Sequence, residues 1–153
     1  MAASAAEQLD GFLAKFTPEV AAMAQGALKK LRRRYPTALE LVYDNYNALA
    51  IGFAPSEKTS TAIFSIAVYP RWVSLFFLQA KGVPDPEGLL KGSGKVARHV
   101  VLESPADLDA PAMVAMMEAA VEVAKMPFAA KGKCGIVIKS VSAKQRPRRP
   151  TTA

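Results

Sequence analysis

The stretch AIFSIAVYPRWVSLFFLQ, residues 62–79, determines the predicted fold. Its two halves, 62–69 and 72–79, are apolar at nearly every position, which is typical of strands that are covered on both faces. Pro70 and Arg71 separate the halves, and proline favours a turn because it fixes φ and lacks the N–H that a ladder needs. The stretch therefore predicts a tight hairpin of two strands near the centre of a sheet.

Other strand-like runs lie on both sides of this hairpin. Each is a short apolar or alternating segment bounded by turn residues. These runs are residues 38–44, 48–54, 97–104 and 135–141. With the hairpin they predict a sheet of about five to six strands.

Three segments have helical signals. Ser4 followed by Glu7 fits a capping box, and Thr17 followed by Pro18 fits the start of a second helix. Residues 110–126, rich in alanine and methionine, form the third. Helices, then a run of strands, then a helix and a strand is the order of an α+β domain. We therefore expect a mainly antiparallel sheet packed with N-terminal helices and one C-terminal helix.

The composition suits one globular domain. The chain has 153 residues, of which 51% are hydrophobic and 22% are charged. Cys134 is the single cysteine, so an intrachain disulfide and a cysteine-based zinc site are excluded. The longest apolar stretch is interrupted by polar residues, and the first residues lack a basic segment. These features predict a soluble cytoplasmic protein with no membrane partner.

The basic charge is concentrated at the C-terminal end. The chain has 20 Lys and Arg and 13 Asp and Glu residues, and seven of the basic residues lie from Lys131 onward, where no acidic residue occurs. The preceding part therefore has equal numbers of both and no net charge. We interpret residues 1–141 as a single domain and residues 142–153 as a basic, proline-containing tail that is extended or disordered.

The segment GLLKGSGKVARHV, residues 88–100, has the glycine and basic residues of a phosphate-binding loop but lacks the spacing of such a loop. A Walker loop needs a glycine where Leu89 stands and a serine or threonine where Val96 stands, and a strand pattern follows instead of a helix. His99 has no partner nearby in the sequence that would orient it for acid–base catalysis. The sequence therefore predicts no nucleotide cofactor, no metal site and no catalytic residue.

Aromatic and basic side chains gather near the predicted strand ends. The segments YDNYN, residues 43–47, and YPRW, residues 69–72, contain three of the four tyrosines and the only tryptophan. Rings with polar tips suit the rim of a pocket, and they also suit packing at the end of a sheet. Basic residues beside them favour an anionic ligand. The candidate ligand-binding residues are Tyr43, Tyr46, Tyr69, Arg71, Trp72, Lys91, Lys95, Arg98 and His99.

The tail offers a second kind of site. QRPRRP, residues 145–150, is an extended cationic arm whose arginines are Arg146, Arg148 and Arg149. Neutralisation of phosphates by such an arm gives salt-dependent, sequence-independent nucleic-acid binding. A solubilising tail without a dedicated partner explains the same pattern, so both interpretations stay open. The rest of the chain has no helix-turn-helix or RNA-recognition signature.

Three segments resemble the YdhG-like domain of unknown function. They are residues 17–53, 68–77 and 89–103, and with the closing helix the similarity covers residues 12–126. The resemblance implies a small cytoplasmic α+β domain with a curved antiparallel sheet. Some members are described as frataxin-like iron chaperones, which implies weak iron binding through surface carboxylates. The carboxylates available for this are Glu7, Asp10, Asp107 and Asp109.

Together these patterns predict a non-enzymatic binding module for a small anionic ligand or a protein partner. Two alternatives stay beside it. The first is a frataxin-like iron chaperone, which rests on the family resemblance. The second is weak nucleic-acid binding through the basic tail, which rests on its charge.

Overall fold

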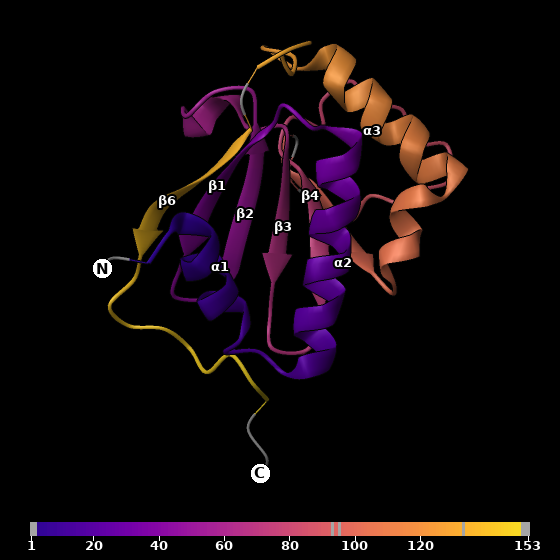
Figure 1. Cartoon of the computed structure of the whole chain (residues 1–153). Helices are drawn as coiled ribbons and strands as arrows, with labels where there is room; N and C mark the ends of the chain where they lie inside the picture. Colours follow the sequence, from indigo (N-terminus) through magenta and orange to yellow (C-terminus); the bar gives the residue numbers. More distant parts are fainter. Residues whose placement is uncertain (1–2, 93, 95, 133, 151–153) are drawn as a thin grey trace.

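The sequence folds into an open, six-stranded sheet with helices packed on one face, shown in Figure 1. This computed structural model describes residues 3–92, 94, 96–132 and 134–150. The strands are β1 (Leu39–Asp44), β2 (Leu49–Ala54), β3 (Phe64–Val68), β4 (Val73–Phe77), β5 (Arg98–Leu102) and β6 (Gly135–Val141). The predicted α+β class is confirmed.

The order of the strands across the sheet is β5-β4-β3-β2-β1-β6. The predicted hairpin, β3 and β4, lies inside the sheet, and every residue of β3 is buried. Neighbouring strands are antiparallel except β6, which lies parallel to β1. The last strand therefore crosses the whole domain to reach the edge opposite β5.

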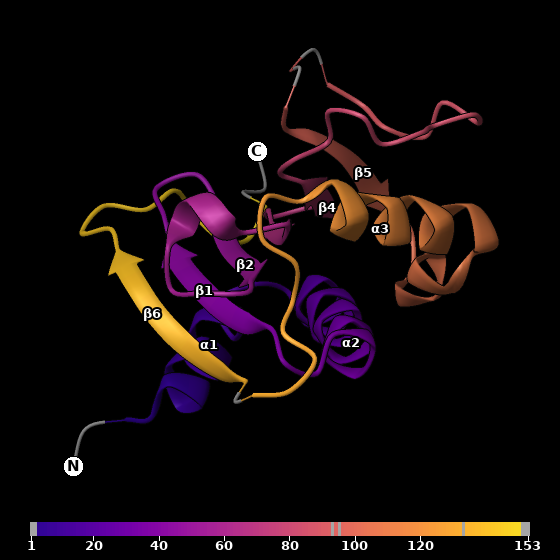
Figure 2. The ribbon, with the colours of Figure 1, turned by 90° about the horizontal axis from the view of Figure 1, so that it is seen from above.

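Two helices, α1 (Ala5–Leu13) and α2 (Pro18–Arg34), lie over one face of the sheet (Figure 1). Helix α3 (Pro111–Val123) lies on the β4–β5 side (Figure 2). Short 3-10 turns are η1 (Thr59–Thr61) and η2 (Pro105–Asp109). The capping residues act as predicted. No helix in the described part of the chain has both the length and the apolar character needed to cross a membrane.

The main core lies between the sheet and the helices. Phe64 is at its centre, with its ring 5.4 Å from that of Tyr35 and 5.5 Å from that of Phe77. The opposite face of the sheet has a smaller cluster formed by Leu41, Ala54 and Ala62. Outside that cluster, the residues at the centre of this face are small, namely Ala50, Gly52, Ser65 and Ala67. This helix-free face is therefore hollow near its middle.

Strand direction brings three distant segments to one end of the sheet. β1 runs into the turn 45–48, β3 runs into the turn 69–72, and β6, parallel to β1, runs into residues 142–150. We call this end the tail end. The loop 78–97 and the start of β5 lie at the other end, because β4 runs away from the turn 69–72 before the chain returns.

Helix α2 packs closely on η2 at Gly26. A methyl group there would lie 2.6 Å from Pro105 Cγ, whereas one on Gly11 in α1 would meet no described atom within 4 Å. Alanine favours a helix over glycine by about 1 kcal/mol, so we expect Gly11→Ala to raise the free energy of unfolding by up to that amount. Gly26→Ala is expected to lower it by about 1 kcal/mol, because overpacking outweighs the gain in propensity.

Urea denaturation of the two variants tests whether Gly11→Ala raises the free energy of unfolding and Gly26→Ala lowers it. Both variants make the same chemical change inside a helix, so propensity alone gives them the same effect. A Gly26→Ala variant that is more stable than the wild type would contradict the close packing of α2 on η2.

Candidate functional site

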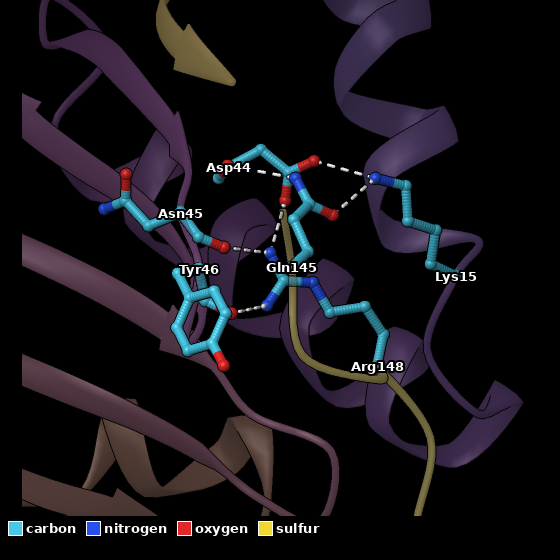
Figure 3. A network of polar contacts seen from close by, with 6 residues as sticks. All are labelled: Lys15, Asp44, Asn45, Tyr46, Gln145 and Arg148. Atoms are coloured by element: carbon cyan, nitrogen blue, oxygen red, sulfur yellow. Dashed lines mark hydrogen bonds and ion pairs between the residues drawn. The ribbon is translucent and has the colours of Figure 1, made fainter. Parts of the chain in front are cut away.

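A buried carboxylate joins three elements at the tail end of the sheet. Asp44, the last residue of β1, has no exposed side-chain area. Its Oδ2 accepts a hydrogen bond from Lys15 Nζ at 2.8 Å, and its Oδ1 accepts one from Arg148 Nη2 at 2.8 Å, as Figure 3 shows. Because a buried charge is stable only when paired, Asp44 ties the end of α1 and the tail to the sheet.

Two opposing effects set the pKa of Asp44. Burial alone would raise the pKa, because it disfavours the charged carboxylate. Hydrogen bonds from Lys15, Gln145 and Arg148 outweigh burial and hold the pKa below its usual value. The carboxylate is therefore charged at neutral pH, and it forms an ion pair with each of the two cations that contact it.

Residues 142–150 are extended and lie against the body of the domain. Ser142 N donates to Asp44 O at 2.8 Å, and Gln145 Nε2 donates to the same oxygen at 3.1 Å. Arg146 N donates to Tyr46 O at 2.8 Å. These bonds run from the end of β1 into the turn 45–48, so the tail continues the path of β6 and passes beside that turn.

Arg148 has a different role from the one that its charge predicted. Its side chain is 3% exposed, its Nη1 donates to Tyr46 O at 3.4 Å, and its Nη2 also donates to Asn45 O. Its guanidinium lies 5.7 Å from the ring centroid of Phe16. We proposed it above as a nucleic-acid contact, but burial and pairing with Asp44 remove it from the surface. Arg148 holds the tail in place instead.

The other two tail arginines are exposed. Arg149 Nε donates to Lys15 O at 3.1 Å and its Nη2 to Ala14 O at 3.3 Å, so it binds carbonyls just after α1, where cations are favourable. The Arg146 guanidinium lies 5.8 Å from the ring centroid of Tyr46. Within the described residues neither side chain forms a salt bridge. Both positive charges are therefore available to a ligand.

The tail faces the turn 69–72 across a groove of about 710 Å³. Tyr69 N donates to Trp72 O at 2.9 Å, which closes the predicted hairpin turn, and the two rings stack with centroids 4.7 Å apart. Arg71 is exposed beside them. We call this the arginine–aromatic groove, and its main residues are Asn47, Tyr69, Arg71, Trp72, Arg146 and Arg149. Among the described residues that line it, none is acidic.

A second hollow of about 540 Å³ adjoins the groove on the helix-free face of the sheet. Asn47 and Tyr69 line both spaces, so the two are adjacent. The floor of this sheet hollow is formed by small side chains, and its walls are aromatic. The floor residues are Ala50, Ser65 and Ala67, and the wall residues are Tyr46, Tyr69 and Phe76.

Known proteins give no guide to the use of this site. No family model, curated protein or solved structure matches this chain. The resemblance to the YdhG-like domain therefore stays a prediction from the sequence.

The structure brings four of the nine predicted ligand-binding residues to the tail end. Tyr69, Arg71 and Trp72 line the groove, and Tyr46 lines the adjoining sheet hollow. Tyr43 does not join them, because its ring packs with the cluster around Leu41 and its hydroxyl bonds to Thr59. Of the predicted aromatic residues, all except Tyr43 therefore lie at the tail end.

Apart from Arg71, the predicted basic residues that the structure describes do not join that site. In the β4–β5 register Arg98 lies opposite Phe77 and His99 opposite Phe76, several residues from the turn 69–72. Arg98 is on the helix-covered side, and Lys91 is bonded through its backbone to His99, whose ring stacks on Phe76 at 5.0 Å. Lys95 lies outside the described residues. Antiparallel pairing is the reason, because it places the start of β5 at the opposite end of the sheet.

Three of the four carboxylates named for iron binding are already engaged in local structure. Glu7 caps α1, Asp107 accepts hydrogen bonds from the backbone of residues 103 and 104, and Asp109 pairs with Lys30. Within the part of the chain that the structure describes, no three His, Cys, Asp or Glu side chains are grouped to hold a metal ion.

Sequence reasoning missed Lys15, Asp44 and Gln145, which hold the tail. The only signal was that Asp44 shares an alternating face with Val42, which points toward the helices. An acidic residue on the covered face of a strand needs a cation. Nothing local indicated that this cation lies 104 residues away in the tail.

Proposed function

We propose that this chain is a non-enzymatic binding module that takes a phosphate-bearing, anionic ligand in the arginine–aromatic groove. The observation that supports this is the meeting of Arg71, from the hairpin turn, with Arg146 and Arg149, from the tail, along one groove. Guanidinium groups match the geometry of phosphate oxygens and bind them in pairs of hydrogen bonds.

The local charge balance favours an anion. Asp44, the buried acid at the tail end, is already neutralised by Lys15 and Arg148. The three groove arginines therefore keep their charge without a described acidic neighbour in the groove lining. A concave surface lined by one sign of charge concentrates ligands of the opposite sign. A volume of about 710 Å³ lies within the range of ligand sites.

The iron-chaperone alternative rests on the family resemblance alone. The carboxylates that it would use are spread over η2 and α1, and those with bonds in the structure cap helices or pair with a lysine. No described contact favours it over the groove.

Inorganic polyphosphate is a suitable first probe, because it presents phosphates without any base or sugar. We expect the Arg146→Ala/Arg149→Ala double variant to bind polyphosphate about tenfold or more weakly than the wild type in calorimetric titration, because two charge-assisted contacts are lost. Binding should also weaken with rising salt. Urea denaturation of the same variant shows whether the loss of the Arg149 bonds to α1 has altered the fold.

The matched control is Lys29→Ala/Arg33→Ala, which removes the same two charges from exposed positions near the C-terminal end of α2. In Figure 1 that end of α2 lies away from the tail end of the sheet. We expect its affinity for polyphosphate to stay within about twofold of the wild-type value, because distant exposed charges are screened. Equal losses in both double variants would contradict a specific site, and absence of wild-type binding would contradict the proposed function itself.

A further inference from the structure

We infer that the anionic ligand of the groove is a single-stranded nucleic acid, whose bases stack on Trp72 while its phosphates contact Arg71, Arg146 and Arg149. This inference rests on the proposed function and names the ligand class for the same site. It also replaces the idea of a free cationic arm, because the tail contributes two arginines to a formed groove and uses the third, Arg148, to stay docked.

The groove contains an exposed aromatic platform that a simple phosphate ligand does not need. Tyr69 covers one face of the Trp72 ring, with an angle of 20° between the ring planes, and Trp72 is still 43% exposed. Exposed aromatic rings beside cationic side chains are the recurring arrangement in proteins that bind single strands, because every base has a flat face to stack. Trp72 thus has the position and the exposure of a stacking residue.

The adjoining sheet hollow gives room for a second base. Tyr46 at its rim is 50% exposed, and Arg146 lies over its ring. The floor beneath is made of alanine and serine, so the space is not filled from within. Asn45 and Asn47 also line this hollow, and side-chain amides can bond to the edges of an unpaired base. The rings and amides here suit an unpaired base better than a bare polyanion.

Single strands fit these features better than a duplex does. In a duplex both faces of each base are covered by neighbours, so the Trp72 ring would have nothing to stack on. A single strand exposes the bases and the phosphates together, and the groove offers rings and guanidinium groups side by side. With three arginines at the phosphates we expect the logarithm of affinity to fall with the logarithm of salt concentration with a slope of about −2.

The fluorescence of Trp72 reports the stacking directly, because it is the only tryptophan in the chain. The probe is a deoxythymidine oligonucleotide of about 12 nucleotides, a length within the usual site size. We expect it to quench the fluorescence on binding. Polyphosphate with the same number of phosphates is expected to bind without comparable quenching, since it has no base.

Substitutions of Trp72 separate the contribution of base stacking to affinity from that of charge. Trp72→Ala is expected to lower the affinity for the labelled oligonucleotide by about tenfold, measured by anisotropy, and to leave the affinity for polyphosphate within about twofold. Trp72→Phe keeps a flat ring and should recover most of the oligonucleotide affinity. Circular dichroism checks that both variants fold, as expected for a side chain that is partly in solvent.

The possible outcomes distinguish this inference from the proposed function. If polyphosphate binds as tightly as the oligonucleotide and Trp72→Ala weakens neither, the single-strand inference is overturned and the anion site stands. Tighter binding of a duplex of the same length also overturns it. If neither probe binds the wild-type chain, the proposed function fails, and the inference fails with it.

Discussion

Replacing Asp44 with alanine is expected to lower the free energy of unfolding by about 3 kcal/mol and to release residues 142–150 from the sheet. The carboxylate is fully buried and pairs with Lys15 and Arg148. Removing one partner of a buried pair costs about 3–5 kcal/mol, because the other charge is left without compensation. We expect a cost at the low end of this range, since Lys15 is partly exposed and Arg148 lies outside the helices and strands, on a segment that can turn into water.

Two measurements check this prediction. Urea denaturation gives the loss of stability, and limited trypsin digestion reports release of the tail, because the bonds after Lys144 and Arg148 become accessible. The control is Asp109→Ala, which removes a carboxylate from an exposed pair with Lys30 and should leave the denaturation midpoint unchanged. If Asp44→Ala is as stable as the wild type and its tail is equally protected, the ion pair does not hold the tail.

The same carboxylate gives the stability a defined dependence on pH. The pKa of Asp44 in the folded chain lies below the value of 3.8 expected when it is unfolded. As the pH falls, the unfolded chain therefore takes up this proton first, and stability declines. The contribution of Asp44 is complete above the unfolded pKa and is lost as the pH falls through the folded pKa. The Asp44→Ala variant should lack this part of the acid-induced decline.

Replacing Phe64 with alanine is expected to cost about 4 kcal/mol of the free energy of unfolding. Phe64 has no exposed area and is at the centre of the helix-side core. Its ring contacts those of Tyr35, Phe77 and Phe128. Truncation loses the burial of the ring and leaves a cavity that rigid aromatic neighbours fill poorly, which places the cost in the upper part of the usual range.

Phe76→Ala is the matched control for Phe64→Ala. It makes the same truncation on the next strand, but Phe76 is partly exposed on the helix-free face. We expect its cost, measured by urea denaturation, to be less than half that of Phe64→Ala, because less apolar area returns to water. Equal costs would contradict the assignment of the main core to the helix-covered face.

The fold was predictable where its signals are local. The hairpin in residues 62–79 was evident because two runs that are apolar at nearly every position flank a proline, and both strands are indeed inside the sheet. The capping pairs Ser4–Glu7 and Thr17–Pro18 marked the helix starts for the same reason. Each of these signals depends on residues that are neighbours in the chain, so it does not need tertiary information.

The site was less predictable because it depends on which strand ends meet. Tyr69 and Trp72 were recognised from their clustering, but Arg98 and His99 were grouped with them although antiparallel pairing places β5 at the other end. The contribution of the tail depends on β6 pairing in parallel with β1, which brings Arg148 to Asp44. Composition shows that the tail is basic, and only the fold shows which arginine is buried.

We propose that the docked tail, and not net charge, creates the binding groove. Asp44→Ala tests this most directly, because it leaves Arg71, Arg146 and Arg149 in the chain and makes the net charge more positive by one. A binding mode that depends on charge alone therefore predicts equal or tighter binding, whereas a formed groove predicts weaker binding.

The decisive measurement is a parallel calorimetric titration of the wild type and Asp44→Ala with polyphosphate, at one salt concentration and under conditions in which circular dichroism shows both to be folded. We predict that the variant binds about tenfold more weakly, because the two tail arginines are no longer held beside Arg71. Equal or tighter binding by the variant would contradict the account.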